Sequence, residues 1–364
     1  MLIQDVITQL EQKYPLSWQE DFDNSGIQCG DARQELTGIV VCFDPSTSVV
    51  KEAIKQGANL VISHHPVLIQ GIKKIIPGSL SGNTLCAALS SGVVLYAMHT
   101  NMDSAPNGGN DLFAQKIGLT RCSVLSPQEN RYRKLVFFVH ADYAAPLKNA
   151  LFDMGCGMLG AYDHCSYSMT GEGCFRPSSE ANPFVGEKLQ ETRVNEEKIE
   201  MIFPAVIQRK VVETLFKYHP YEEPAFDLVP LLNTDRHVGL GRVGYLPAPM
   251  PEDKFLSMLK DKLNINQLRY TCGAKDMISK VALCGGGGAS LLKAALSENA
   301  DAYITGDLKY HDFLDATHRM LVVDMGHFES EHFIREIIIQ EIKNMNLPVS
   351  CQIAKTEEMK IKYI

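Results

Sequence analysis

The stretch LTGIVVCFDPSTSVVKEAIKQGANLVISHHP, residues 36–66, decides the fold. It contains an apolar strand (36–44), a helix that begins after a serine and ends at a glycine (46–57), and a second apolar strand (59–63). Two strands joined by a helix form a βαβ unit, and such units build mostly parallel sheets. The sequence therefore predicts an α/β protein.

The same alternation returns near the C-terminus. The predicted elements are strand 279–284, helix 289–299, strand 301–305, helix 308–317, strand 319–325, helix 329–344 and strand 348–353. The segments GANLVISHHP (57–66) and NADAYITGDL (299–308) share one pattern, an apolar strand followed by a hydroxyl residue and a polar corner. This likeness favours two related α/β lobes with mostly parallel sheets.

The middle of the chain has a different pattern, which begins after the polar linker SPQENR (126–131). The predicted elements are strand 134–140, helix 145–155, strand 163–170, strand 188–203, helix 205–218 and strand 222–231. This β-α-β-β-α-β order is typical of a ferredoxin-like α+β domain. We therefore expect an inserted domain at residues 132–232, within an α/β domain whose two parts are residues 1–131 and 233–364.

Composition excludes several classes of protein. Of the 364 residues 45% are hydrophobic, so the chain can bury sizeable cores, and the net charge of −8 argues against nucleic acid as a partner. No apolar run approaches the roughly 18 residues of a membrane span, and the N-terminus does not resemble a signal peptide. The ten cysteines form no C-x-x-C pair, which favours free thiols. We expect a cytoplasmic protein that does not bind membranes.

Two adjacent histidines, His64 and His65, follow the second strand of the opening segment. Neighbouring strand residues point to opposite faces, so both rings can share one site only if the chain turns there. Pro66 favours such a turn. The pair is therefore either part of a loop without a metal-binding role or part of a metal site.

Three further places combine metal-ligand residues with the ends of predicted strands or the starts of helices. With the histidine pair, the candidates are His64 and His65, His99 and Asp103, Asp307 and His311, and His327 and Glu331. Because ligands bind outside the carboxyl ends of strands in open α/β sheets, the four places predict one site.

Structural interpretations compete with these assignments. A lone loop histidine usually makes an ordinary hydrogen bond, and His327 with Glu331 could be a surface pair one helical turn apart. His219 has no acidic partner at metal spacing, so a structural role is favoured. The segment CGGGGAS (284–290) could cradle a phosphate or could allow close backbone packing.

The number of ligands bears on the number of metal ions. Three histidines and two carboxylates suit two ions about 3.5–4 Å apart, because each carboxylate can bridge. A single tetrahedral zinc would need fewer ligands. Imidazole with carboxylate accepts zinc, iron or manganese, so the metal stays open.

Five motifs, taken in order, resemble the Nif-three-like dinuclear-metal family, whose members carry the name GTP cyclohydrolase 1 type 2 homolog. They are DFDNSGIQCGD (21–31), ISHHP (62–66), HTNMD (99–103), TGDLKYH (305–311) and DMGHFESE (324–331). The resemblance covers about residues 1–124 and 239–364. The middle segment, with KYHPYEEPAFDLVPL (217–231), resembles the CutA-like or PII-like domain of the longer bacterial members.

The resemblance implies a toroidal homohexamer with two divalent metal ions per subunit in the cleft between the lobes. It assigns metal binding to five residues: His64, His65, Asp103, His327 and Glu331. Three residues of the neighbouring motifs, His99, Asp307 and His311, are expected to act in catalysis or proton transfer.

The leading hypothesis is a metal-dependent hydrolase in which a metal-activated water attacks a purine nucleotide such as GTP. Two alternatives stay open. One is a two-metal phosphoesterase or another hydrolase acting on a phosphorylated small molecule. The other is a metal-binding regulatory hexamer without catalytic activity.

Overall fold

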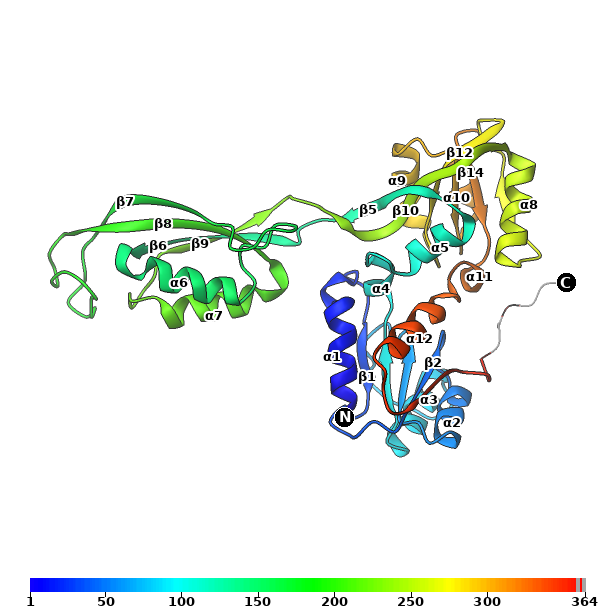
Figure 1. Ribbon diagram of the computed structural model, residues 1–364, viewed down its shortest axis with the longest axis horizontal. Helices are drawn as coiled ribbons and strands as arrows, with labels where there is room; N and C mark the ends of the chain where they lie inside the picture. The colour runs from blue at the N-terminus through cyan, green and yellow to red at the C-terminus, as the bar shows by residue number, and fades with distance from the viewer. Residues whose placement is uncertain (358–360, 362–364) are drawn as a thin grey trace. The chain divides into compact units, whose positions relative to one another are not determined.

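The computed structural model describes residues 1–357 and 361 (Figure 1). The chain forms two compact units. One unit combines residues 1–127 with those from 236 onward, and the other spans residues 128–235. The first unit holds two sheets, and the second unit holds one.

The first sheet has five strands in the order β1-β4-β3-β2-β15. They are β1 (Gly26–Cys29), β4 (Val94–Ala97), β3 (Leu60–Ser63), β2 (Gly38–Cys42) and β15 (Ser350–Ile353). Four of the strands are parallel, and β1 is antiparallel to β4. The three central strands are buried along their whole length, which explains why they are apolar without alternation.

Helices cover both faces of this sheet. Helices α1 (Ile3–Lys13) and α12 (Ile334–Asn344) pack on one face, where the core includes Ile39 and Ile62. Helices α2 (Thr47–Lys55) and α3 (Leu80–Ser90) lie on the other face, where Val40 and Val61 are buried (Figure 1). Neighbouring residues of one strand thus enter opposite cores, as a pleated strand requires.

The second sheet has six strands in the order β11-β14-β13-β12-β10-β5. They are β11 (Arg269–Thr271), β14 (Leu321–Asp324), β13 (Ala302–Thr305), β12 (Met277–Leu283), β10 (Asp235–Pro251) and β5 (Thr120–Gln128). The strands β12, β13 and β14 are parallel, whereas β10 and β11 are antiparallel to their neighbours. The predicted α/β class with mostly parallel sheets is confirmed.

Four helices flank the second sheet. On one face lie α5 (Gly109–Ile117) and α8 (Glu252–Leu263), and on the other lie α9 (Leu292–Ser297) and α10 (Tyr310–Ala316). Arg242 on β10 is buried and donates to both carboxylate oxygens of Asp111 on α5, at 2.6 and 2.9 Å. This ion pair, in which Arg242 is buried and Asp111 is partly exposed, fixes α5 against the sheet.

The C-terminal segment differs from its prediction in its helices, and the structure adds the partner of its predicted last strand. The single helix expected at 329–344 is two helices, α11 (His327–Glu331) and α12, and the final strand β15 pairs with β2 of the first sheet. The apolar stripe Ile334, Ile338 and Ile342 on α12 packs into the core of the first sheet, which carries the chain back to that lobe. The break between α11 and α12 allows α11, which carries His327 and Glu331, to be oriented independently of α12.

The second compact unit is a four-stranded antiparallel sheet in the order β7-β8-β6-β9. Its elements in chain order are β6 (Tyr132–His140), α6 (Ala141–Asp153), β7 (Tyr167–Phe175), β8 (Thr192–Pro204), α7 (Gln208–Tyr218) and β9 (Phe226–Leu231). Both helices cover one face, and the core there includes Phe137 and Ile199 (Figure 1). Whether residues 132–232 fold without the rest of the chain stays a prediction.

Two further expectations can be checked against the described residues. The ten cysteines, all within the described part of the chain, carry free thiols. No described helix combines the length and the apolar composition that a membrane span needs.

Candidate metal centre

The backbone after β3 explains how two adjacent histidines reach one site. The amide groups of His64 and His65 donate to the carbonyl oxygens of Cys42 and Phe43, at 3.1 and 3.0 Å, so pairing with the neighbouring chain continues past the strand. The hydroxyl of Ser63 donates to the His65 carbonyl at 2.7 Å and closes a turn. The turn brings the two ring centroids within 5.0 Å of each other.

His64 presents a nitrogen without a hydrogen to the site. Its Nδ1 lies 2.8 Å from the carbonyl oxygen of Met98, and because a carbonyl only accepts, Nδ1 carries the proton. Burial lowers the pKa of His64 to about 4, so the ring is neutral at pH 7. Its Nε2 is fully buried without a hydrogen-bond partner, 3.3 Å from Glu331 Oε1 and 3.7 Å from Asp103 Oδ2.

The ring nitrogens of His65 and His327 also converge on Glu331. Their Nδ1 atoms lie 2.7 Å from carboxylate oxygens of Asp44 and Asp307, respectively. Their Nε2 atoms lie 3.2 Å apart and face Glu331 Oε2 at 3.4 and 3.1 Å. Burial opposes a positive charge, but the surrounding carboxylates raise the pKa of His65 to about 10 and that of His327 to about 9. The arrangement therefore calls for a cation on or between the rings.

The two buried carboxylates have opposite electrostatic environments. Burial, followed by the charge of Glu331, raises the pKa of Asp103 well above its usual range. Burial also opposes ionisation of Glu331, but the three neighbouring imidazoles hold its pKa well below its usual value. The backbone leaves room for this carboxylate only because residue 286 is glycine: a Cβ there would lie 2.8 Å from Glu331 Oε1.

Three groups of donors have their ligand atoms within 4.8 Å of one another. They are His64, His65 and His99; His65, His327 and Glu331; and His64, Asp103 and Glu331. The five residues expected to bind metal all belong to these groups. The Nε2 of His64 is buried without a hydrogen-bond partner, and the Nε2 atoms of His65 and His327 converge on one oxygen of Glu331, so the donor set suits divalent cations.

Two aspartates near the site were not predicted as functional residues. Asp44 holds His65, and Asp23 lies 2.7 Å from the Nδ1 of His99. Burial opposes ionisation of Asp23, but the hydrogen bond and charge of His99 hold its pKa well below the ordinary range. Asp44 lies two residues after the end of the buried strand β2, and Asp23 lies in the motif DFDNSGIQCGD, so both carried a sequence signal.

The three expected catalytic residues lie in different surroundings. His99 belongs to one of the donor groups, and Asp307 accepts from His327 while adopting a left-handed backbone conformation with φ of 57°. His311 is exposed on α10, with its ring 5.5 Å from that of Tyr310. Among the described residues, the donor groups bring His99 to the site and do not include His311.

The glycine-rich segment 284–290 packs closely against β13. A Cβ at Gly288 would lie 2.5 Å from both the Thr305 hydroxyl and the Tyr303 hydroxyl. The amide of Gly286 donates to the Ser330 hydroxyl at 3.0 Å, next to the candidate ligand on α11. These contacts support the close-packing interpretation of the segment over the phosphate cradle.

Two cavities adjoin the donor groups. One, of about 500 Å³, is lined by Asp44, His65 and the hydroxyl residues at the start of α2. The other, of about 390 Å³, is lined by Asp307, His327 and Arg269 among others. Both volumes fall in the usual range for small-molecule sites, so a substrate has room beside the donors.

Comparison with known proteins identifies relatives over nearly the whole chain. The model of the family Duf34/NIF3 (NGG1p interacting factor 3) matches residues 1–360. A Bacillus subtilis protein named GTP cyclohydrolase 1 type 2 homolog is 36% identical over 344 residues, which cover 94% of this chain and 92% of the relative.

Solved structures give the same result. A Bacillus cereus protein described as related to NIF3 aligns with a TM-score of 0.77 and 32% identity, covering 100% of this chain and 99% of its own. A Staphylococcus aureus protein aligns with a TM-score of 0.78 and 28% identity, with the same coverage.

Proposed function

The chain belongs to the Duf34/NIF3 family, and on that premise we propose that it holds two divalent metal ions and hydrolyses a purine nucleotide. The name of the Bacillus subtilis relative, GTP cyclohydrolase 1 type 2 homolog, supports GTP as the first substrate to test. The metals proposed are zinc, iron or manganese, which imidazole and carboxylate ligands accept.

The observation that carries the proposal is the division of Glu331 between two sets of donors. Its Oε1 faces His64 at 3.3 Å, whereas its Oε2 faces His65 and His327 at 3.4 and 3.1 Å. His64 and Asp103 would hold one ion, His65 and His327 would hold the other, and Glu331 would be available to both. A shared carboxylate is the usual means of holding two ions close together.

The protein's own residues orient these donors and handle protons. A bound metal pair supplies Lewis acidity and lowers the pKa of water towards neutrality. Asp44 and Asp307 fix the Nδ1 tautomers of two rings, which keeps each Nε2 free to coordinate. His99, held by Asp23, is proposed to accept a proton when a first water adds to C8 of the purine and opens the ring to a formamide. It is proposed to act again when a second water attacks the formyl carbon, and to return the proton to the departing amine as formate is released.

The larger cavity beside His65 suits an anionic substrate. Ser46, Thr47 and Ser48 line it together with Ser81, and α2 begins there. Hydroxyl groups donate to phosphate oxygens, and the amino-terminal end of a helix attracts negative charge. The phosphate groups of a nucleotide are proposed to lie in this cavity.

The test is turnover by the metal-loaded protein. We expect formate and a pterin precursor from GTP, and His99→Ala should lower the rate far more than its matched control His311→Ala, whose ring is exposed. Generic phosphoesters are assayed in parallel. Release of phosphate or cleavage of an ester, without formate, would replace the cyclohydrolase assignment with a phosphoesterase, and the absence of turnover on every substrate would contradict a hydrolase.

We also propose a homohexamer, the assembly that the family resemblance implies. Between β3 and α3, four isoleucines are between 43% and 56% exposed: Ile69, Ile72, Ile75 and Ile76. Apolar side chains concentrated in one exposed segment favour a protein contact. Light scattering should give about six times the chain mass of 40.4 kDa.

A further inference from the structure

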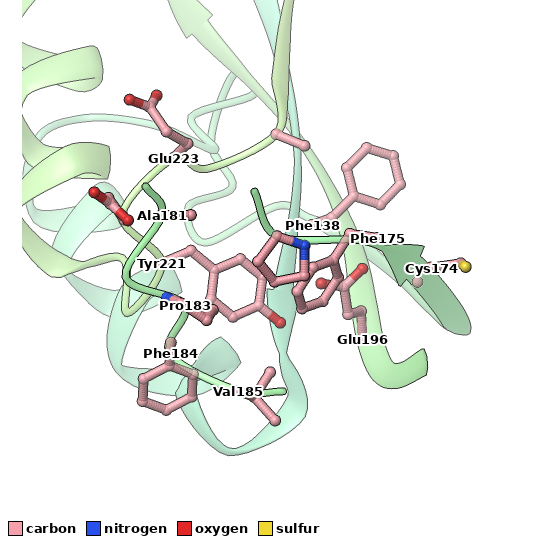
Figure 2. Close-up of a pocket in the computed structure, with 14 residues that line it drawn as sticks. Phe138, Cys174, Phe175, Ala181, Pro183, Phe184, Val185, Glu196, Tyr221 and Glu223 are labelled. Carbon is pink, nitrogen blue, oxygen red and sulfur yellow. The ribbon is translucent and has the colours of Figure 1, made fainter. Parts of the chain in front are cut away.

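The antiparallel unit has a cavity on the sheet face opposite α6 and α7. The cavity has a volume of about 340 Å³ and lies between the sheet and the loop that joins β7 to β8. Four aromatic rings line it, those of Phe138, Phe175, Phe184 and Tyr221. Figure 2 shows Tyr221 and Glu196 near the centre, with other rings around them.

The aromatic wall is held in place by defined contacts. The backbone N–H of Tyr221 donates to His219 Nδ1 at 3.1 Å, so the proton of that ring is on Nε2, which donates to the Phe138 carbonyl at 2.9 Å. Burial lowers the pKa of His219, which keeps the ring neutral. The histidine therefore has a structural role, joining two walls of the cavity.

The loop across the cavity is also anchored. The amide of Asn182 donates to the Glu222 carboxylate at 2.8 Å. The ring of Phe184 packs edge-on against Tyr143, with a centroid distance of 5.3 Å, and lies 6.0 Å from the ring of Tyr221. These contacts form the cavity within the chain itself, so a ligand would not need to order it.

A single carboxylate occupies the centre. Glu196 lies over the backbone of Gly173, where a Cβ would come within 2.1 Å of its Oε2. Burial, followed by the Glu196 carboxylate, raises the pKa of Tyr221 above its ordinary value. Glycine at residue 173 thus makes room for the carboxylate beside the tyrosine hydroxyl.

The charged side chains that line the cavity are acidic. Glu196, Glu222 and Glu223 line the cavity, and among the described lining residues none is lysine, arginine or histidine. An anion would be repelled by these carboxylates. A neutral apolar molecule would shield a carboxylate from water without offering it a charge or a hydrogen-bond donor. A metal ion would find aromatic carbon instead of converging ligand atoms. The lining is complementary to a positively charged organic group.

We propose that this cavity binds an organic ammonium ion. The cationic head contacts Glu196 and the faces of the aromatic rings, and an apolar remainder lies along the loop side, near Pro183 and Val185. Aromatic rings attract ammonium groups through their negative faces, and a nearby carboxylate adds to this attraction. The proposal is independent of the metal centre and of its reaction.

Binding is tested with the full chain and two matched probes. Choline carries a quaternary ammonium group, and 3,3-dimethylbutan-1-ol has the same shape without the charge. By calorimetry we expect choline to bind at least about tenfold more tightly than the alcohol. Benzyltrimethylammonium, which fills more of the cavity, should bind more tightly than choline. Equal affinity for choline and the alcohol, or no binding of any probe, would overturn the proposal.

Variants locate the site. Glu196→Gln keeps the shape and removes the charge, and Gly173→Ala displaces the carboxylate, so both should weaken choline binding about tenfold or more. The control is Glu197→Gln, because Glu197 is the next residue of β8 and pairs with Lys148 of α6 at 3.7 Å, on the helix side of the sheet. Unchanged affinity in Glu196→Gln would contradict the assignment.

A second copy of the chain is the competing occupant of this face. Light scattering on Glu196→Gln and Phe184→Ala separates the two cases. We expect both variants to keep the wild-type mass while losing affinity for choline. A change in mass without a change in affinity would mean that the face is a subunit contact, and the ammonium site would be rejected.

Discussion

The candidate metal centre and the cavity of the antiparallel unit both concentrate negative charge, but they do so in different ways. At the metal centre, the ligand atoms of each group lie within 4.8 Å of one another, and the Nε2 of His64 has no hydrogen-bond partner. In the cavity, the carboxylate of Glu196 lies among four aromatic residues. Converging lone pairs suit a small metal ion, whereas aromatic walls suit a large ammonium ion.

The carboxylates of the two sites also differ in how deeply they are buried. Glu331 is 5% exposed, whereas Glu222 and Glu223, which line the other cavity, are exposed. A buried carboxylate needs an opposite charge and hydrogen bonds. Removing either the carboxylates or the histidines of the candidate metal centre should therefore destabilise the folded protein. The edge of the cavity leaves these two carboxylates in contact with water. The comparison teaches that two sites built around carboxylates can differ in the size of the cation that their geometry suits.

The largest effect is expected from Glu331→Ala. Because this carboxylate faces both sets of histidines, its loss should remove nearly all bound metal and leave choline binding intact. Elemental analysis measures the metal, and circular dichroism checks the fold. The matched control is Glu329→Ala, on the same helix but outside the donor groups. Full metal occupancy in Glu331→Ala would contradict the shared-ligand assignment.

A smaller loss is expected from Asp44→Ala. The residue orients His65 through a hydrogen bond of 2.7 Å and belongs to none of the donor groups of the described residues. Removing such an orienting carboxylate typically lowers metal affinity about 10- to 100-fold. Competition with a chromophoric chelator measures the change. An affinity equal to that of wild type would mean that the hydrogen bond does not position the ring.

The metal-free protein should lose stability as the pH rises. The pKa values of His65 and His327 are raised from 6.5 to about 10 and about 9 in the folded state, so the folded state holds more protons than the unfolded state between these limits. The stabilisation is complete below pH 6.5 and is lost through pH 9–10.

Thermal unfolding after chelation, followed from pH 6.5 to pH 10, measures this loss. Added metal should remove most of the dependence, because the ion replaces the protons between the rings. A transition temperature of the metal-free protein that stays constant or increases over this range would contradict the described contacts of the two histidines.

The smallest effect on metal is expected from deleting residues 132–232 and joining the ends with a short Gly/Ser linker. The candidate ligands all lie outside this segment, so metal per chain should stay unchanged while choline binding disappears. Light scattering would show whether assembly depends on the segment. A misfolded product without metal would show that the segment is integral to the α/β core.

The sequence predicts the central strands well and their partners less well. Ile39, Val41 and Ile62 lie in runs that are apolar on both faces, which is typical of a parallel sheet covered by helices. The stripe of Ile334, Ile338 and Ile342 likewise indicates that one face of α12 is buried. It does not show against which sheet, because periodicity records burial and not the partner.

The candidate site could likewise be predicted only in part. The histidines and carboxylates at strand ends are visible in the sequence because polar residues interrupt apolar runs there. Asp23 was missed because its partner His99 is 76 residues away, and only the fold brings the two together. The cavity in the antiparallel unit depends on a loop without periodicity, so its aromatic and acidic residues could not be grouped from the sequence.

The central claim is that two metal ions bind per chain, and metal stoichiometry tests it most directly. The full chain is loaded with zinc, iron or manganese in turn, freed of excess ions, and analysed for metal against a protein concentration from amino-acid analysis. The account predicts two ions per chain at saturation with at least one of these metals. Saturation at one ion per chain, or no retained metal, would contradict it.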